Sequence, residues 1–162
     1  SSDVCSSDLR LAFRLLCDED EAKDMVQETF VKVWLALGKY NGECRFSTWI
    51  YKITCNTCYD RLRSLYHSPL DNEADYSVSV NISSDDNVEL AVVNKQLREL
   101  ILRYTDELSP RQRLIFTLRD IEELDVPEVQ TITGLSAGII KTTLYLARKN
   151  IRNKMNQIDA GL

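Results

Sequence analysis

The side chains best suited to catalysis or metal binding are the cysteines, and their positions favour neither role. Among five cysteines and a single histidine, Cys55 and Cys58 form a C-x-x-C pair in the middle of a predicted helix. A redox pair would need a helix N-terminus to lower a thiol pKa, and zinc would need two further ligands, for which the candidates are Cys17, Cys44 and His67. Paired carboxylates, a Ser/His/Asp set and a glycine-rich phosphate loop do not occur in the sequence. We therefore expect no enzyme activity, no metal and no cofactor.

Residues 20–37 combine acidic and apolar side chains along a helix, a pattern suited to binding another protein. The expected inner face of this helix is apolar and consists of Ala22, Met25, Val26, Phe30, Val33, Trp34 and Leu37. The opposite, outward stripe consists of Asp24, Gln27, Glu28, Val31 and Leu35. Such a stripe is either an ordinary solvated surface or a docking strip for a partner helix.

The next helix, expected from about Ser47 as N-cap to about Ser64, carries groups that suit nucleic acids. Its expected inner face consists of Phe46, Trp49, Ile50, Ile53 and Thr57. The other side carries, at helical spacing, Lys52, Asn56, Tyr59 and Arg63. Two cations, an amide and an aromatic ring on one stripe can bind phosphates and stack on bases or hydrogen-bond to them. A solvated helix face is the alternative interpretation.

The C-terminal third contains the start and stop signals of a helix-turn-helix. A Ser-Pro pair at 109–110 begins one helix. Asp125 and Glu128 form a capping box for a short helix, which we expect to end at Gly134 in a left-handed conformation. Ser136 then caps the last helix.

The outer face of that last helix is basic, within a chain of net charge −5. This face consists of Ala137, Lys141, Thr142, Tyr145 and Arg148. Residues 141–154 contain five bases and no acids, which is the charge segregation expected of a nucleic-acid surface. A helix end that complements its own dipole would explain the bases at 152–154 but not Lys141 in the second turn.

The amino-acid composition indicates the fold class and the domain organisation that must position these stripes. A hydrophobic fraction of 44% and a charged fraction of 28% are typical of a folded protein, and no apolar run reaches the ~18 residues of a membrane span. Five glycines and three prolines favour long helices. Residues 65–89 carry acids but no Lys or Arg, as expected of a flexible acidic linker. We therefore expect an all-α protein with two small helical domains, 9–64 and 90–158.

The first eight residues contain Ser-Ser-Asp twice and show no helical periodicity. We expect residues 1–8 to be either a non-native addition or a frayed native tail, and neither interpretation gives them a function. The odd number of cysteines, together with the lack of a signal-peptide pattern, favours a reduced, cytoplasmic protein.

Three segments, in this order, resemble the sigma-70 family of bacterial RNA polymerase sigma factors. The helix of that family that binds core polymerase is similar to residues 18–34, DEDEAKDMVQETFVKVW, and the segment that opens and recognises the −10 element is similar to residues 46–56, FSTWIYKITCN. The domain that recognises the −35 element is similar to residues 108–113, LSPRQR, with the helix-turn-helix at 125–150. The layout of two domains and an acidic linker resembles the extracytoplasmic-function (ECF) group, and the resemblance covers about 10–155.

The resemblance implies a factor that binds core RNA polymerase, directs it to promoters and helps to melt the −10 element. It implies docking on a coiled coil of the largest polymerase subunit through Asp24, Gln27, Glu28, Val31 and Leu35. It implies −10 contacts, with loop 38–45 receiving a flipped-out base, through Tyr40, Asn41, Trp49, Lys52, Asn56, Tyr59 and Arg63. It implies −35 contacts in the major groove through Ser136, Ala137, Lys141, Thr142, Tyr145, Arg148 and Lys149. Many members of the group are held inactive by an anti-sigma factor, so the resemblance also implies such a partner.

The sequence departs from the family pattern at three places. Family members usually have a longer helix before Arg10, a small alanine at the position of Gln130, and bases at the positions of Thr143 and Leu146. The −35 sequence preference therefore does not transfer.

Two other classes of protein remain open from the residues alone. A helix-turn-helix regulator that works without polymerase has no use for the stripe at 24–35, and a helical protein-binding module, or thiol sensor, has no use for the basic last helix.

Overall fold

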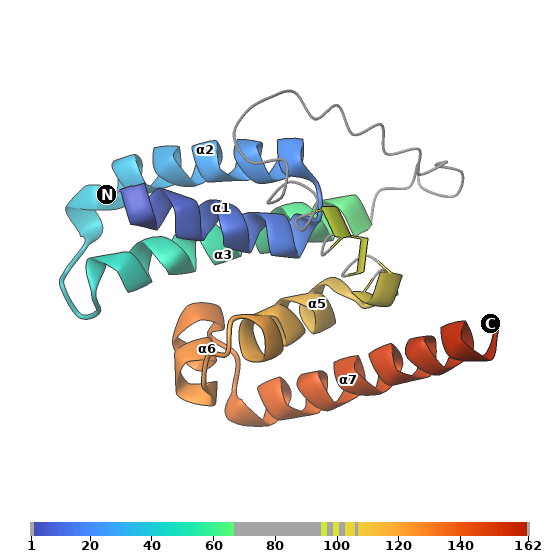
Figure 1. Ribbon diagram of the computed structural model, residues 1–162. Coiled ribbons are helices and arrows are strands. Elements are labelled where there is room, and N and C mark those ends of the chain that lie inside the picture. Colours follow the sequence, from blue (N-terminus) through green and yellow to red (C-terminus); the bar gives the residue numbers. More distant parts are fainter. Residues whose placement is uncertain (1, 67–94, 97–98, 101–102, 106, 162) are drawn as a thin grey trace.

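The computed structural model describes residues 2–66, 95–96, 99–100, 103–105 and 107–161. In these residues every regular element is helical, as predicted, and Figure 1 shows two groups of helices stacked on one another. The first group consists of α1 (Ser2–Leu16), α2 (Glu19–Ala36), the short 3-10 helix η1 (Leu37–Lys39) and α3 (Phe46–Tyr66). The second consists of α5 (Pro110–Phe116), the π-helical turn η2 (Thr117–Ile121), α6 (Val126–Thr133) and α7 (Ala137–Ala160). Most of the predicted linker at 65–89 lies outside the described residues, as does much of the helix expected after it.

The N-terminal helix corrects the expectation of a non-helical tail over residues 1–8. Helix α1 begins at Ser2, because the apolar spacing from Leu11 onward stabilises a helix that then extends toward the N-terminus, and extending a helix is easier than nucleating one. Leu11 and Leu15 are at most 1% exposed and anchor α1 against α2 and α3. Cys17 follows with a φ of 54°, and this left-handed residue ends the helix.

The expected inner face of α2 is confirmed for Ala22, Met25 and Val26, which are buried, but is wrong farther along the helix. Three large apolar side chains expected inside are exposed: Phe30 (42%), Trp34 (77%) and Leu37 (45%). Helix α1 packs beside α2 in the antiparallel direction, so residues 2–7 run along this end of α2.

Helix α3 begins at Phe46, one residue earlier than predicted, so Ser47 lies inside the first turn rather than at the N-cap. The chain turns before the helix instead, where Gly42 has a φ of 76° and the Asn41 side chain accepts a hydrogen bond from the Glu43 N–H at 3.2 Å. Helix α3 runs to Tyr66, slightly beyond the expected end.

The signals predicted for the helix-turn-helix are confirmed at atomic level. Asp125 and Glu128 exchange two hydrogen bonds of 2.8 Å between side chain and backbone, and they fix the start of α6. Gly134 ends α6 with a φ of 73°, a conformation that disfavours any side chain. Ser136 caps α7 by accepting a hydrogen bond from the Ile139 N–H at 3.3 Å. The predicted helix that begins at 109–110 is present as α5 followed by η2.

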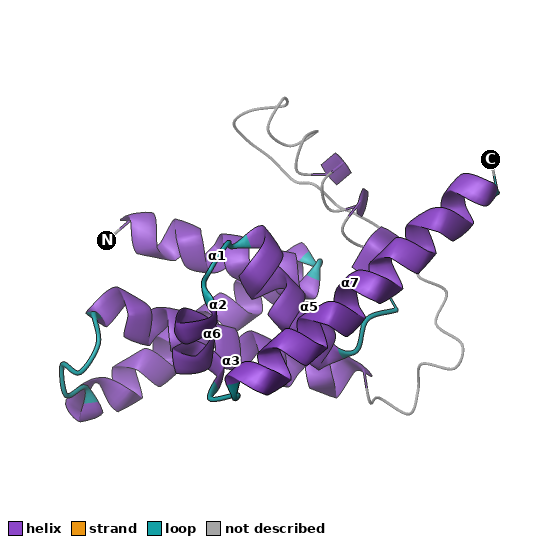
Figure 2. Ribbon diagram, turned by 90° about the horizontal axis from the view of Figure 1, so that it is seen from below, coloured by secondary structure: helices purple, strands orange, loops and turns teal. Residues whose placement is uncertain are grey.

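The two groups of helices share one hydrophobic core. Helix α3 packs against both α5 and α6, and the views in Figures 1 and 2 agree on this arrangement. Buried side chains form a continuous cluster that includes Leu11 and Leu15 of α1 as well as Leu114 of α5 and Leu118 of η2. The domain boundaries at 9–64 and 90–158 stay a prediction. Within the described residues, no helix has the length and apolar character needed to cross a membrane.

Candidate polymerase and nucleic-acid interfaces

The outward stripe of α2 lies in solvent along its whole length. All five residues predicted for protein docking are exposed: Asp24, Gln27, Glu28, Val31 and Leu35. Val31 and Leu35 are 58% and 75% exposed. The Glu28 carboxylate is oriented by the Lys32 ammonium, 2.8 Å away, which also donates to the Thr57 hydroxyl on α3 at 3.3 Å. An acidic group is thus held in place beside apolar side chains that have no cover.

Sequence reasoning missed one member of this surface, Trp34. Its spacing fits the apolar face of α2, yet it is 77% exposed beside Leu35. Single exposed apolar residues are ordinary, whereas neighbouring ones mark interaction sites. Helical spacing within α2 could not have identified it, because spacing placed Trp34 on the inner face. We call Trp34 and the five predicted residues the α2 docking face.

Three aromatic rings anchor the loop between η1 and α3. Tyr40 and Phe46 meet edge to face with centroids 5.3 Å apart, and Trp49 lies 5.2 Å from Tyr40 and stacks on Phe46 at 5.7 Å. The Tyr40 hydroxyl donates to the Cys44 carbonyl at 2.5 Å and closes the loop. Asn41 is exposed at its tip, and Tyr40 and Trp49 are half-buried. The structure therefore brings together Tyr40, Asn41 and Trp49, three residues that we predicted to contact the −10 element.

The predicted nucleic-acid stripe of α3 is also on the surface. Lys52, Asn56 and Arg63 are exposed, and Tyr59 is half-buried with the Arg63 guanidinium 5.7 Å from its ring centroid. Three of the four residues, Asn56, Tyr59 and Arg63, line a cleft of about 540 Å³ whose other wall comes from the second group of helices. No pattern in the sequence predicted that opposite wall.

The outer face of α7 carries the predicted basic residues, but one of them, Arg148, forms an ion pair within the protein. The residues predicted for −35 contacts that are exposed on α7 are Lys141, Thr142, Tyr145, Arg148 and Lys149. Ser136 caps the helix, and Ala137 is half-buried. Arg148 forms a fork with Asp120 of η2, at 2.8 Å from Nε and 2.5 Å from Nη2, and this contact raises the pKa of Arg148 above its ordinary value. Its charge is therefore partly neutralised within the protein.

The C-x-x-C pair belongs to the core. Cys55 and Cys58 are both 0% exposed on α3. Burial raises the pKa of the Cys58 thiol to about 12 and that of Cys55 even further, so neither forms a reactive thiolate near neutral pH. The part of the chain that the structure describes contains no cluster of three or more Cys, His, Asp or Glu side chains placed to hold a metal ion.

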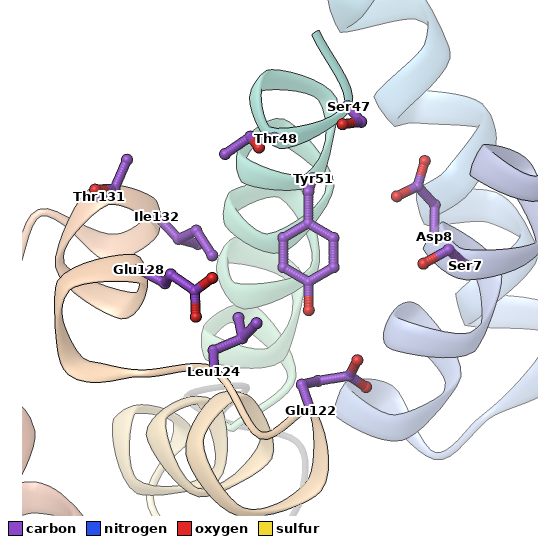
Figure 3. A pocket seen from close by; sticks show the side chains of 10 residues that line it. All are labelled: Ser7, Asp8, Ser47, Thr48, Tyr51, Glu122, Leu124, Glu128, Thr131 and Ile132. Atoms are coloured by element: carbon purple, nitrogen blue, oxygen red, sulfur yellow. The ribbon is translucent and has the colours of Figure 1, made fainter. Parts of the chain in front are cut away.

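A second cavity, of about 450 Å³, lies where α1, α3 and α6 meet (Figure 3). The Tyr51 side chain of α3 stands between Asp8 of α1 and Glu122, just after η2. Burial raises the pKa of Asp8 to about 6, although a hydrogen bond with Thr54 lowers it in part. Burial, with Glu122 nearby, raises the pKa of Tyr51 as well. Three segments far apart in sequence form this cavity, which is why no sequence pattern predicted it.

Comparison with known families identifies both groups of helices. Sigma-70 region 2 matches residues 9–67, and Sigma-70, region 4 matches residues 98–151. The ECF RNA polymerase sigma-E factors of Salmonella typhimurium (strain LT2) and Escherichia coli (strain K12) are each 28% identical over 144 residues, which cover 85% of this chain and 75% of theirs. The ECF RNA polymerase sigma factor SigW of Bacillus subtilis is 24% identical and covers 92% of this chain and 83% of its own.

Two solved structures have the same fold. The sigma factor RpoE, in complex with the anti-sigma factor NepR from Bartonella quintana, has a TM-score of 0.63 at 22% identity and covers 94% of this chain and 92% of its own. CnrH, in complex with the cytosolic domain of CnrY, has a TM-score of 0.64 at 19% identity and covers 94% and 82%. Because regions 2 and 4 are both present, in order, and the relatives that match over most of the chain are ECF factors, the chain belongs to the ECF group of the sigma-70 family of RNA polymerase sigma factors.

Proposed function

We propose that this sigma factor, which directs RNA polymerase to promoters and initiates transcription, divides the work among three separate surfaces and performs no chemistry itself. The α2 docking face binds core polymerase, α3 with loop 40–45 holds the melted −10 element, and α7 recognises the −35 duplex. The observation that carries this proposal is that each surface presents polar and aromatic side chains to solvent from a helix whose opposite side is buried in the core. Each surface can therefore bind a partner without disturbing the fold.

The α2 docking face has the composition of an interface centre. Trp34 and Leu35 offer exposed apolar area, and Glu28 and Asp24 lie about two and three turns before them on α2. Interfaces concentrate their binding energy in a few buried aromatic or apolar anchors surrounded by polar residues. A partner that complements this face must present apolar and basic side chains. We propose that this partner is the coiled coil of the largest polymerase subunit.

The −10 surface suits unstacked bases. Turning one base out of the duplex costs a few kcal/mol, and stacking on an aromatic side chain returns ~1–3 kcal/mol per base. Tyr40 and Trp49 supply rings at the foot of the loop, and Lys52 and Asn56 supply a phosphate contact and a base-edge donor and acceptor on the adjoining face of α3. Capture of bases by these groups would stabilise the melted strand.

The −35 surface has the geometry of a recognition helix. Helix α7 presents Lys141, Thr142 and Tyr145 on the side opposite Ile140 and Leu144, which are buried against the rest of the domain. In a helix-turn-helix the N-terminal part of the second helix meets base edges in the major groove. The fork between Arg148 and Asp120 holds α7 on η2, so we assign Arg148 a positioning role in addition to a phosphate contact.

Lys141→Ala should weaken binding to duplex DNA and lower the salt dependence of that binding by about one unit in the log–log slope, because one phosphate contact is lost. Fluorescence anisotropy with a short duplex of mixed sequence, titrated at several salt concentrations, measures the slope. Lys154→Ala is the control, because Lys154 lies 13 residues farther along α7, about 20 Å away, and pairs with Glu107. An equal loss of slope in both variants would show that the effect is one of net charge and not of this surface.

The relative RpoE was solved in complex with an anti-sigma factor, NepR. By extension we propose that this protein also has an anti-sigma partner, and that it acts in the cytoplasm, where polymerase and promoter DNA are found.

A further inference from the structure

Helix α7 carries apolar side chains within its basic outer face. Ile139 and Leu146 are large apolar residues, and they are 43% and 42% exposed. They are seven residues apart, so they lie on the same side of α7, about two turns from one another. Thr142, whose side chain includes a methyl group, is exposed between them. We call Ile139, Thr142 and Leu146 the α7 apolar strip.

The fold turns this strip away from the core. Helix α7 packs on the rest of the domain through Ile140 and Leu144, which are buried, and α5 lies along α7 (Figure 1). At about 100° per residue, the centre of the strip lies roughly 130° around the helix from these buried side chains. Exposed apolar side chains that are neighbours mark interaction sites. The strip is therefore available to a partner without any change in the fold.

The charge around the strip indicates what this partner is. From Ala137 to Ile158, α7 contains five bases and no acid. Two of the bases, Lys141 and Lys149, are exposed beside the strip. In the major groove of DNA, phosphates border the groove and the base edges form its floor, so a basic helix face with an apolar strip complements it. Duplex DNA is therefore the occupant that the charge favours.

Few side chains at this end of α7 can read bases through hydrogen bonds. Bidentate recognition of guanine needs Arg or Lys, and that of adenine needs Asn or Gln. From its start to the end of the strip, α7 contains one such side chain, Lys141. Farther along, Arg148 forms a fork with Asp120, and the Asn150 amide donates to the Gln112 side chain at 3.3 Å. Sequence recognition at the strip therefore has to rely largely on apolar contacts.

Thymine is the base that an apolar strip can recognise. Its C5-methyl group is the apolar group that base pairs present in the major groove, and aliphatic side chains and the threonine methyl group contact it. Ile139 and Leu146 are about 10 Å apart along the axis of α7. That separation corresponds to about three base-pair steps of ~3.4 Å. Two thymines at this spacing would each meet one large side chain.

We propose that the α7 apolar strip determines the −35 specificity of this protein by contacting the C5-methyl groups of two thymines about three base-pair steps apart. This inference rests on the assignment of α7 to the −35 duplex, and it goes further by naming the base and the residues that select it. Lys141 and Lys149 hold the helix on the phosphates, and the strip supplies the sequence preference.

The test removes only the methyl groups. Holoenzyme made from core bacterial polymerase and the full chain first enriches promoters from a randomised duplex library, which defines the −35 block. Each thymine of that block is then replaced in turn by deoxyuridine, which lacks the C5-methyl group and keeps every hydrogen-bonding group. Fluorescence anisotropy at fixed salt measures the affinity of holoenzyme containing the parent, Ile139→Ala or Leu146→Ala for each duplex, and circular dichroism checks that each variant is folded.

The matched control is Met155→Ala. Met155 is an apolar residue of α7 with the same exposure as Ile139, 43%, but it lies 16 residues farther along the helix, about 24 Å away. It should discriminate between thymine and deoxyuridine as the parent does.

The parent should lose about 4-fold in affinity at each of two positions when thymine becomes deoxyuridine, because one methyl group leaves an apolar contact. Leu146→Ala should bind the two bases equally at one of these positions, and Ile139→Ala should do so at the other. A merely structural loss would weaken binding to both bases alike and leave their ratio unchanged. A −35 block without thymine, or a ratio that neither strip variant changes, overturns the proposal.

A change of specificity tests the same contact by gain rather than loss. Leu146→Arg places a guanidinium at the end of the strip, where it can bind guanine in a bidentate manner. Holoenzyme with this variant should enrich promoters in which guanine replaces one thymine of the −35 block, while the other thymine is kept. Enrichment of the parent block would show that Leu146 does not select a base.

Failure of the strip and failure of the α7 assignment give different results. If a −35 block is enriched and Lys141→Ala weakens binding to it, but deoxyuridine changes nothing, α7 binds the duplex and only the methyl contacts are wrong. If no block near −35 is enriched, the assignment of α7 fails as well. A dimer of the full chain in size-exclusion chromatography with light scattering, dissociated by Leu146→Ala, would assign the strip to self-association and overturn the proposal.

Discussion

Glu28→Lys is expected to abolish co-purification with core RNA polymerase while leaving the helical content of the protein unchanged. Glu28 lies at the centre of the α2 docking face, where its carboxylate is half-exposed and oriented by Lys32 at 2.8 Å. Reversing a charge at the centre of an interface removes a favourable contact and adds a repulsive one, at least about 2 kcal/mol, or roughly 30-fold in affinity. The helix itself loses only a few tenths of a kcal/mol when one i,i+4 pair is removed.

The matched control is Glu19→Lys on the same helix. Glu19 also pairs with a lysine four residues on, Lys23 at 2.7 Å, and its side chain is 52% exposed against 48% for Glu28. The two positions are nine residues apart, which at about 100° per residue places them on opposite sides of α2. Glu19→Lys should therefore keep polymerase binding. Binding is measured by pull-down and by native mass spectrometry. Equal binding by Glu28→Lys and the parent would show that the α2 docking face does not bind core polymerase.

The second large effect is expected in DNA melting. Lys52→Ala combined with Asn56→Ala should reduce open-complex formation by about 100-fold, because each residue contributes on the order of 1–3 kcal/mol to holding the melted strand. The measurement is permanganate reactivity of −10 thymines, on a promoter that the parent holoenzyme enriches from a randomised duplex library. Both side chains are exposed, so their truncation leaves the core of α3 intact.

The same double variant should bind duplex −35 DNA as the parent does, because that contact belongs to α7, and contributions from well-separated sites are nearly additive. Lys23→Ala, which removes a cation from the same half of the protein on α2, should affect neither melting nor duplex binding. Loss of duplex binding by Asn56→Ala would contradict the division of labour. So would unchanged melting by the double variant.

Local signals in this sequence predicted local structure well. The capping box of Asp125 and Glu128, the left-handed Gly134 and the cap at Ser136 each depend on a few neighbouring residues, and all three are confirmed. The error at Ser47 is of the same local kind, because an early turn at Gly42 allows α3 to begin at Phe46. The exposure of Trp34 could not be obtained from α2 alone, since it depends on how the rest of the fold packs against that helix.

The site was predictable as separate stripes but not as an arrangement in space. Helical spacing gave the exposed faces of α2, α3 and α7, and the family resemblance gave them roles. Two contacts that change the interpretation join residues far apart in sequence: Arg148 with Asp120, 28 residues away, and Arg14 with Glu122, 108 residues away. Such pairs leave no pattern in a single sequence, because each partner taken alone is an ordinary charged residue on a helix or turn.

The central claim is that this chain makes core RNA polymerase specific for promoters, and transcription from a randomised promoter library tests it most directly. Core bacterial polymerase is incubated with the library in the presence and in the absence of the full chain, and the templates of the run-off transcripts are sequenced. The account predicts that the chain binds core polymerase, that specific transcripts depend on it, and that their templates share two sequence blocks near −35 and −10. The same transcripts with and without the chain, or failure to bind core polymerase, would contradict it.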